Sequence, residues 1–525
     1  MRSMVWQPEL DELERRKQLA YQMGGEESVA RHRSAGKYTV RERIGRLLDP
    51  GSFHERGVLA GRAEYDESGN LNAFRPSNFV MGMGKINGRP VVVGGDDFTV
   101  RGGAADGAVG GKAGQAERMA RELRMPIVRL VDGTGGGGSV RSSQPSGGGR
   151  GMYIPGNPAW DTIVDAMSEV PVVGAAMGSV AGIGAARVVA SHWSIMMKET
   201  SQVFVAGPPV VERGMGYPIA KEDLGGADIH AHGSGVVDNE ADTEDDCFQQ
   251  IRRWLSYLPQ NVWEMPPAIA PTDDPRRRDE WLLSAVPRER TKVYDCRRIL
   301  RAVMDLDSVF EVGRYYGRSL VTALARLDGK PVGVMINDPY HFGGGLTADA
   351  SHKGVRFIDF CDTFHLPIVN LVDQPGFVIG VEAEKQGTIR AGARFLFAVY
   401  QVTTPWVTVI YRRAYGVAGA GHGRTQSLNL RYVWPSLDAG SLPIEGGVMA
   451  AYRREIEAAP DPDARRRELE DQLNRNRSIW RTAENFNAEE IIDPRDTRAV
   501  LTDWVHLAYD LEKTRLGPKS RGMRP

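Results

Sequence analysis

Two stretches rich in glycine and alanine carry the pattern that best indicates chemistry. The first is "GSVAGIGAARVVA" (178–190), and the second is "RRAYGVAGAGHGRT" (412–425). Each connects an apolar strand to a helix, so the first N–H groups of that helix have no partner within it. Small residues let a ligand approach the backbone closely, and the helix dipole favours negative charge. Such a turn can bind a phosphate or stabilise an oxyanion, although small residues also allow a helix to pack closely on a sheet.

The sequence has no conventional catalytic motif that would place an active site elsewhere. The sequence contains no G-x-S-x-G, H-E-x-x-H or G-x-x-x-x-G-K-[ST] motif. His230 and His232 stand two positions apart in "IHAHGSG", but without a clear third ligand they are expected on a surface strand or loop. His422 lies within the second glycine-rich stretch and is therefore a candidate site residue. No metal site is predicted.

Four blocks of the first half recur in the same order in the second half. "PIVRLVDG" (126–133) recurs as "PIVNLVDQ" (367–374), 367 − 126 = 241 positions later. The other pairs are "RIGRLLDPGSFHE" with "RILRAVMDLDSVFE", "GRPVVVGGDDF" with "GKPVGVMINDPY", and "VAGIGAA" with "YGVAGAG". Because the order is kept while the offset drifts, we infer a duplication followed by small insertions.

The repeat and the proline distribution predict two domains. Residues 256–290 contain six prolines and a charged run, which is typical of an extended linker. We therefore expect a first domain over 1–260, a linker over 261–289 and a second domain over 290–525. In both halves, short apolar runs such as "PIVRLV" and "WVTVIY" alternate with helical patterns. This alternation predicts an α/β fold with a largely parallel, buried sheet in each domain.

The composition is that of an ordinary globular protein, with 41% hydrophobic and 25% charged residues among 525. A formal net charge of −1 gives no overall field to attract nucleic acid or an anionic membrane. Cys247, Cys296 and Cys361 are widely spaced, which favours a reducing compartment over a disulfide framework. No segment has the apolar length of a membrane span, and the N-terminus has no apolar signal core. We therefore predict a cytoplasmic protein.

Longer motifs resemble the carboxyltransferase (β) subunits of biotin-dependent acyl-CoA carboxylases, the propionyl-CoA and methylcrotonyl-CoA carboxylase group. The likeness covers nearly the entire chain. It includes "GKYTVRERIGRLLDPGSFHE" (36–55), "DFTVRGGA" (97–104), "FVAGPPVV" (204–211), "EDLGGADIHAHGSGVVD" (222–238), "FIDFCDTFHLPIVNLVDQPGF" (357–377) and "MAAYRREIE" (449–457). The resemblance implies two crotonase-like domains, in agreement with the internal repeat.

The resemblance implies transfer of a carboxyl group from carboxybiotin to an acyl-CoA through a thioester enolate. In the family, the N-terminal domain holds acyl-CoA, the C-terminal domain of a facing subunit holds biotin, and the active form is usually a hexamer of β subunits. Biotin supplies the base, so the protein supplies placement and an oxyanion hole in each domain. This chain has no A-M-K-M biotin-attachment motif, so if it works as a carboxylase it needs a separate α chain with biotin carboxylase and a biotin carboxyl carrier.

The family motifs assign the expected site residues one by one. Gly182 and Ile183 are the expected catalytic positions in the first domain, and Val417 and Ala418 are their counterparts in the second. The other expected residues are Gly102, Gly103, Gly135, Gly136, Gly178 and Ala181 for the acyl-CoA, and Pro375, Gly376, Phe377, Tyr415 and Gly416 for biotin.

The chain departs from the family at several of these places. Ile183 replaces the second glycine of the family's "A-G-G", and Val417 replaces that of its "Y-G-G-A". A branched residue keeps its amide usable only if its φ is negative. The family's "D-S-G-G-A-R" is here "DGTGGGG" (132–138), without the arginine, and "GAGHGR" stands where propionyl-type members have "Y-D-V-M". These changes leave open an altered pocket, an unusual acyl group or reduced activity.

Two alternative functions stay open on these grounds. The same site could serve a decarboxylase or transcarboxylase component, and the identity of the partner would separate the two directions. Ile183 and Val417 also allow a catalytically weak, β-like scaffold subunit that assembles normally but binds no CoA. The Gly/Ser-rich run 134–151 is expected to form a mobile loop beside the acyl-CoA pocket.

Overall fold

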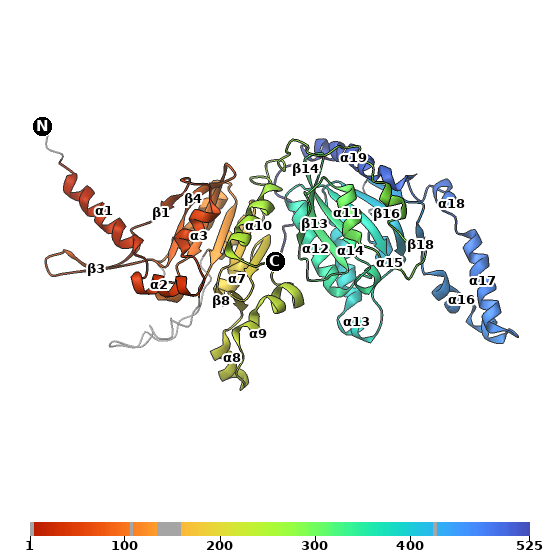
Figure 1. Cartoon of the computed structure of the whole chain (residues 1–525), viewed down its shortest axis with the longest axis horizontal. Coiled ribbons are helices and arrows are strands. Elements are labelled where there is room, and N and C mark those ends of the chain that lie inside the picture. Colours follow the sequence, from red (N-terminus) through yellow and green to blue (C-terminus); the bar gives the residue numbers. More distant parts are fainter. Residues whose placement is uncertain (1–4, 105–108, 134–158, 424–427, 525) are drawn as a thin grey trace. The chain divides into compact units, whose positions relative to one another are not determined.

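The computed structural model describes residues 5–104, 109–133, 159–423 and 428–524, and the chain forms two compact units (Figure 1). The first unit comprises Met1–Glu264 and Gly517–Pro525, and the second comprises Met265–Leu516. The C-terminal residues return to the first unit, where the N–H of Gly517 donates to the carbonyl oxygen of Val262 (2.8 Å). The division therefore falls at Glu264, and the proline-rich residues 265–289 belong to the second unit.

A mixed seven-stranded sheet forms the centre of the first unit, in the order β1-β4-β5-β6-β7-β9-β11. The pairs β1/β4 and β4/β5 are antiparallel, and every pair from β5 to β11 is parallel. β6 is buried along its whole length, as expected for an apolar run in the middle of a parallel sheet. The strands are β1 (His54–Arg56), β4 (Phe79–Ile86), β5 (Arg89–Asp96), β6 (Ile127–Val131), β7 (Val172–Ala176), β9 (Trp193–Met197) and β11 (Asn239–Ala241).

Local sequence explains where several helices of the first unit begin. α3 starts after Thr39, whose side chain accepts from the N–H of Glu42 while the Glu42 carboxylate accepts from the N–H of Thr39. The helices are α1 (Gln7–Tyr21), α2 (Glu26–Ser34), α3 (Val40–Leu47), α4 (Lys112–Glu122), α6 (Trp160–Ala166), α7 (Ile183–Val189), α8 (Pro208–Met215), α9 (Lys221–Gly225) and α10 (Glu244–Ser256). Two small sheets pair β2 (Gly61–Tyr65) with β3 (Leu71–Pro76) and β8 (Ser179–Ala181) with β10 (Gln202–Phe204).

The second unit is built around an eight-stranded sheet in the order β12-β13-β14-β15-β16-β17-β19, with β18 also paired to β16. As in the first unit, an antiparallel beginning is followed by parallel strands. The strands are β12 (Phe310–Val312), β13 (Leu320–Leu327), β14 (Lys330–Asn337), β15 (Ile368–Gln374), β16 (Trp406–Tyr415), β17 (Asn429–Val433), β18 (Asp438–Gly440) and β19 (Glu490–Ile491).

Helices of the second unit cover this sheet, and α12 and α14 pack side by side (Figure 1). The helices are α11 (Cys296–Val303), α12 (Ala348–Thr363), α13 (Val381–Lys385), α14 (Thr388–Gln401), α15 (Gly416–Ala420), α16 (Ile444–Ala458), α17 (Pro462–Asn476), α18 (Ile479–Glu484) and α19 (Thr497–Glu512). Within the described ranges, no helix has both the length and the apolar character needed to cross a membrane.

The four repeated sequence blocks occupy equivalent elements in the two units. The first block covers α3 and β1 in one half and α11 and β12 in the other. The second block forms β5 and β14, and the third forms β6 and β15. The fourth leads into α7 and into α15. The predicted internal repeat is therefore a repeat of structure as well as of sequence.

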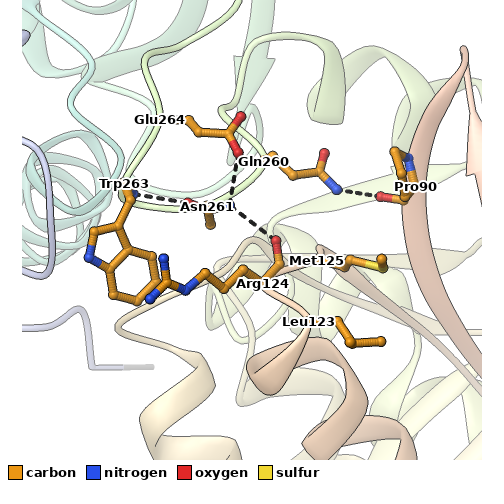
Figure 2. Close-up of a pocket in the computed structure, with 8 residues that line it drawn as sticks. All are labelled: Pro90, Leu123, Arg124, Met125, Gln260, Asn261, Trp263 and Glu264. Carbon is orange, nitrogen blue, oxygen red and sulfur yellow. Dashed lines mark hydrogen bonds between the residues drawn. The ribbon is translucent and has the colours of Figure 1, made fainter.

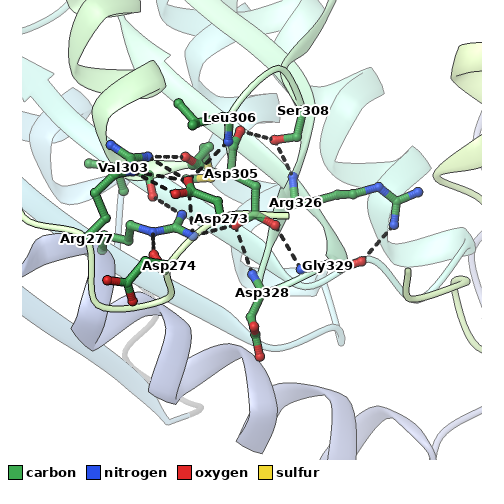
Figure 3. Close-up of polar contacts among 12 residues, drawn as sticks. Asp273, Asp274, Arg277, Val303, Asp305, Leu306, Ser308, Arg326, Asp328 and Gly329 are labelled. Atoms are coloured by element: carbon green, nitrogen blue, oxygen red, sulfur yellow. Dashed lines mark hydrogen bonds and ion pairs between the residues drawn. The ribbon is translucent and has the colours of Figure 1, made fainter. Parts of the chain in front are cut away.

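The proline-rich segment is fastened to the second unit by a network of carboxylates and arginines (Figure 3). Arg277 pairs with Asp273 (3.0 Å) and donates to the carbonyl oxygens at the end of α11 and beyond it. Asp305 accepts from the fully buried Arg498 (2.7 Å), whose Nε donates to the carbonyl oxygen of Asp274. Residues 273–277 are thus an ordered strap on the second unit.

Candidate active site

Each repeated strand ends in a fully buried aspartate that an arginine holds. Asp132 follows β6 and accepts from Arg43 Nη1 (2.7 Å). Asp373 lies in β15 and accepts from Nε (2.5 Å) and Nη2 (2.9 Å) of Arg413. The hydroxyl of Tyr294 also donates to Asp373 (2.5 Å). Both carboxylates lie at the carboxyl ends of parallel strands, which is the edge where α/β sheets form binding sites.

A left-handed turn lies against each of these aspartates. Residues 101–103 have φ values of 58°, 63° and 64°, and residues 342–344 have 51°, 61° and 86°. A Cβ on Gly103 would lie 2.5 Å from the carbonyl oxygen of Asp132, and one on Gly344 would lie 3.0 Å from that of Asp373. The third position of both turns therefore requires glycine for space as well as for conformation.

The sequence prediction included the first of these turns, through Gly102 and Gly103, but missed the second. The offset of 241 that relates the repeated strands also relates Arg101 to Phe342, because 342 − 101 = 241. Applying that offset to "RGG" would have found "FGG" at 342–344.

The first glycine-rich turn begins at Gly182, with φ 59° and ψ −123°. Ile183 starts α7 and has no positive φ, and its side chain is 42% exposed. Among the described residues, the N–H of Ile183 has no hydrogen-bond acceptor. Ala181 precedes the turn in β8, opposite Phe204 of β10. Gly178 is buried, and a Cβ there would lie 2.0 Å from Oδ1 of Asp132. The first turn and the first aspartate are thus neighbours.

The second glycine-rich turn has the same design. Gly416 has φ 60°, Val417 has no positive φ and is 56% exposed, and Ala418 is buried. Tyr415 is buried at the end of β16, and burial together with the neighbouring Asp438 raises its pKa to about 12. Ile183 and Val417 therefore both meet the condition of negative φ, and their amides stay available at the start of α7 and α15.

The loop after β15 closes on the second left-handed turn. The N–H of Leu346 donates to the carbonyl oxygen of Gly376 (3.0 Å), and Leu346 forms an isolated parallel bridge with Phe377. Pro375 lies near the position that a Cβ on Gly344 would occupy, at 3.7 Å. Arg413 joins both features, because its Nη2 donates to the carbonyl oxygen of Gly343 (2.7 Å) as well as to Asp373. The residues expected for biotin therefore gather around one edge of the second sheet.

Asp96 adds an unexpected carboxyl group to the first site. It ends β5, and its Oδ2 accepts from the N–H of Asp132 (3.2 Å). Burial raises its pKa to about 6, and Asp132 adds to this, while Arg187 and Arg43 oppose it. The equivalent residue in the second unit, 337 − 96 = 241 positions later, is Asn337, whose Oδ1 accepts from the N–H of Asp373 in the same way (3.1 Å).

The histidines occupy structural positions. His230 Nε2 lies 2.8 Å from the carbonyl oxygen of Val203, and His232 Nε2 lies 2.9 Å from Glu240. In the part of the chain that the structure describes, no three His, Cys, Asp or Glu side chains form a group able to hold a metal ion. His422 is buried behind the second turn, with Nε2 3.0 Å from Oε1 of Gln374. Gly135, Gly136 and the run 134–151 lie outside the described residues.

A surface pocket of about 530 Å³ lies at the opposite edge of the first sheet (Figure 2). Pro90 and Met125 line it where β5 and β6 begin, and the guanidinium of Arg124 stacks 3.8 Å from the ring centre of Trp263. Because Asp96 and Asp132 mark the other ends of these strands, this pocket is separate from the glycine turns.

The chain is similar to carboxyltransferases over nearly its whole length. The model of the carboxyl transferase domain family matches residues 31–523. The propionyl-CoA carboxylase carboxyltransferase subunit of Haloferax mediterranei is 35% identical over 497 residues, or 94% of this chain and 95% of that protein. Methylmalonyl-CoA decarboxylase subunit alpha of Veillonella parvula is 32% identical over 503 residues, or 96% of each.

A solved structure shares the whole fold. The crystal structure of transcarboxylase 12S, described as a hexamer with methylmalonyl-coenzyme A and methylmalonic acid bound, matches with a TM-score of 0.85. The two chains are 29% identical, and the match covers 99% of each.

Fold, site and likeness together define a carboxyl transferase, and the chain belongs to that family. Within the family, it is a carboxyltransferase of the biotin-dependent acyl-CoA carboxylase type. The predictions of an α/β fold with two crotonase-like domains and of a carboxyltransferase are thereby confirmed.

Proposed function

We propose that the first unit binds the acyl-CoA, that the second unit binds biotin, and that the glycine turn of each unit is an oxyanion hole. The observation that carries this proposal is the pair of matched turns at Gly182 and Gly416. In both, a glycine with φ near 60° precedes a branched residue whose amide lies in the first turn of a short helix. Two turns of this kind could each stabilise an oxyanion, as a reaction requires in which negative charge develops on an oxygen of both reacting groups.

The residues of the two sites fit these ligands. A side chain on Gly103, Gly344 or the buried Gly178 would clash with neighbouring atoms. Glycine at these positions therefore leaves the backbone uncovered. Biotin, carried by a partner protein, supplies the carboxyl group and the base when it is bound. The N–H of Ile183 would donate to the thioester oxygen as that oxygen gains charge, and the amides of Val417 and Ala418 would stabilise negative oxygen on the biotin side.

Fixed charges hold this arrangement in place. The Arg43–Asp132 pair joins α3 to the end of β6, and the Arg413–Asp373 pair joins β16 to β15. Each arginine also donates to a neighbouring loop, Arg43 to the carbonyl oxygen of Met177 and Arg413 to that of Gly343. Desolvation lowers the pKa of Arg43, but the charges of Asp132 and Glu244 outweigh it and raise that pKa above its ordinary value. These arginines therefore stay charged and orient the loops that carry the turns.

We also propose a hexamer of this chain and an α partner that carries biotin carboxylase and the biotin carboxyl carrier. The likeness to hexameric transcarboxylase 12S supports the assembly. A second candidate function, decarboxylation or transcarboxylation, is favoured by the likeness to the Veillonella parvula decarboxylase subunit. The cytoplasmic location stays a prediction.

Carboxyl transfer to and from free biotin tests the proposal without a partner. The purified chain is incubated with biotin and a panel of carboxylated acyl-CoAs of increasing chain length, and the acyl-CoA products are separated and quantified. We expect biotin-dependent loss of the carboxyl group from at least one of them. A chain that assembles and binds CoA but transfers nothing would contradict the proposal, and one that also binds no CoA would support the scaffold alternative.

A further inference from the structure

The one position that differs within the repeated strand "PIV-x-LVD" carries a buried polar side chain in both units. It is Arg129 in β6 and Asn370 in β15, and 370 − 129 = 241. Arg129 is 1% exposed and Asn370 is fully buried. A parallel sheet rarely buries such groups without a hydrogen-bonding purpose, because their desolvation is unfavourable.

Arg129 holds the carboxyl end of α7. Its Nη1 donates to the carbonyl oxygens of Arg187 (3.0 Å) and Ala190 (2.5 Å). These carbonyls belong to the last turn of the helix and its cap, where no further helical N–H follows. The other side of the guanidinium forms two hydrogen bonds with the buried Glu117 (2.8 and 2.9 Å), so Arg129 is itself fixed.

Asn370 holds the end of α15 in the same way. Its Nδ2 donates to the carbonyl oxygen of His422 (3.2 Å), two residues after the helix ends, and to Nδ1 of the same histidine (3.1 Å). Its Oδ1 has no hydrogen-bond partner within the described residues. Asn370 therefore contacts the segment after α15 through its Nδ2 donors and not through its Oδ1 acceptor.

The bond to Nδ1 also fixes the proton on His422. Because Nδ1 accepts, Nε2 must carry the hydrogen, which it donates to Oε1 of Gln374 (3.0 Å). Gln374 in turn donates to the carbonyl oxygens of Gly344 (3.3 Å) and Gly376 (2.7 Å). Burial lowers the pKa of His422 to about 4, so the ring is neutral at physiological pH. Asn370 thus reaches the left-handed turn as well as α15.

The geometry of these short helices makes such anchoring important. α7 has seven residues and α15 has five, and isolated helices of this length do not hold their own conformation. A glycine with φ near 60° stands at the beginning of each, as Gly182 directly before α7 and as Gly416 at the first position of α15, and glycine has wide backbone freedom. The direction of the first amides therefore depends on what fixes the other end of the helix.

We propose that Arg129 and Asn370 are positioning residues for the two oxyanion turns. Each ties the carboxyl end of the turn's helix to the central strand and so sets where the amides at the opposite end point. The assignment of α7 to the acyl-CoA and of α15 to biotin rests on the proposed function.

The test uses one altered side chain per unit and one matched control for each. Arg129→Lys keeps the positive charge beside Glu117 but loses the planar fork that serves two carbonyls. Arg121→Lys on α4 is its control, because that arginine is 39% exposed and pairs with Asp165 (2.8 Å) and Glu169 (3.4 Å). Asn370→Leu removes the donors and keeps the number and branching of the side-chain heavy atoms. The control for Asn370→Leu is Thr404→Val, because the buried hydroxyl of Thr404 has no partner among the described residues.

Two measurements are made on the full-length, assembled protein. Hydrogen exchange by mass spectrometry should speed up about tenfold in the peptide 183–190 of Arg129→Lys only, and in 416–422 of Asn370→Leu only. Steady-state transfer with free biotin should show kcat reduced about tenfold or more in both, with KM raised for acyl-CoA in the first and for biotin in the second. The controls should keep the exchange and kcat of the unaltered chain.

The outcomes separate the two proposals. No transfer by the unaltered chain overturns the proposed function. An active chain whose variants keep kcat, or raise both KM values equally, overturns the positioning role. Exchange that is unchanged in the matching peptide, or changed equally in the control, also overturns it.

Discussion

Gly182 and Gly416 set the direction of the amides that we propose as oxyanion donors, because each adopts a backbone conformation that other residues rarely reach. Gly182 combines φ 59° with ψ −123°, and Gly416 has φ 60°. The residues after them need no such freedom, which explains how Ile183 and Val417 can stand where the family has glycine. Their side chains point outward, 42% and 56% exposed, beside the amides. They therefore shape the approach to each turn and do not remove its donors.

Gly182→Ala should abolish most activity with little loss of packing. A Cβ at this position meets nothing within 4 Å, but it would strain the backbone by about 1–3 kcal/mol at this φ and ψ. The strain is relieved only if the turn moves, so kcat should fall about 100-fold or more, as for a lost oxyanion donor. Gly214→Ala is the control, since it lies in α8 with negative φ and open space. Equal kcat in both variants would contradict this account.

Asp96 should make the first unit less stable as the pH rises. Its pKa is about 6 in the folded chain and about 3.8 when unfolded, so folding favours the protonated form. This contribution is present below pH ~4 and is lost as the pH rises through ~6. Asp96→Asn, which copies Asn337, should therefore raise the free energy of unfolding by roughly 1–2 kcal/mol at pH 8 and change it little at pH 4. Denaturant unfolding at the two pH values measures this, and an equal effect at both would refute it.

At the scale of elements, the strap formed by residues 273–277 links the start of the second unit to the ends of α11 and to α19. Fully buried Arg498 of α19 lies between Asp305 (2.7 Å) and Asp273 (3.4 Å). A buried charge cluster of this kind is costly to break on one side, because the remaining carboxylates keep their desolvation penalty.

Arg498→Met should lower the free energy of unfolding of the second unit by about 3–5 kcal/mol. Arg276→Ala removes an exposed pair with Asp503 (2.5 Å) from the same strap and should cost less than about 1 kcal/mol. Guanidinium unfolding followed by tryptophan fluorescence and by far-UV circular dichroism compares the two. Similar losses for both arginines would mean that the strap is not held by the buried cluster.

The sequence predicted those elements whose cause is local or repeated. The offset of 241 identified β6 and β15, and the small residues of 178–190 and 412–425 identified both glycine turns. Sequence patterns could not reveal that Arg43 pairs with Asp132, 89 positions away, or that the side chain of His422 contacts Gln374. Such contacts depend on how separate elements pack, which single-residue patterns do not encode. The prolines of 256–290 likewise predict an extended backbone, but they do not encode the contacts by which Asp273 and Arg277 attach this segment to the second unit.

At the scale of the whole molecule, we predict that an apolar stripe on α14 contacts another copy of the chain. Ile389, Phe397 and Tyr400 share one face of this helix and are 61%, 66% and 39% exposed. Exposed apolar side chains in a row are typical of protein interfaces. Together with the likeness to hexameric transcarboxylase 12S, this supports assembly through α14.

Phe397→Asp should therefore dissociate the assembly and abolish carboxyl transfer without unfolding the chain. The charge would be buried without a partner in the contact but fully hydrated in a free subunit, so dissociation is the favoured response. Six chains of 57.7 kDa give about 346 kDa, which sedimentation velocity distinguishes readily from smaller species. Leu507→Asp on α19 is the matched control, since that side chain is 67% exposed and lies outside the stripe. A Phe397→Asp variant that keeps the mass of the unaltered assembly would place the contact elsewhere.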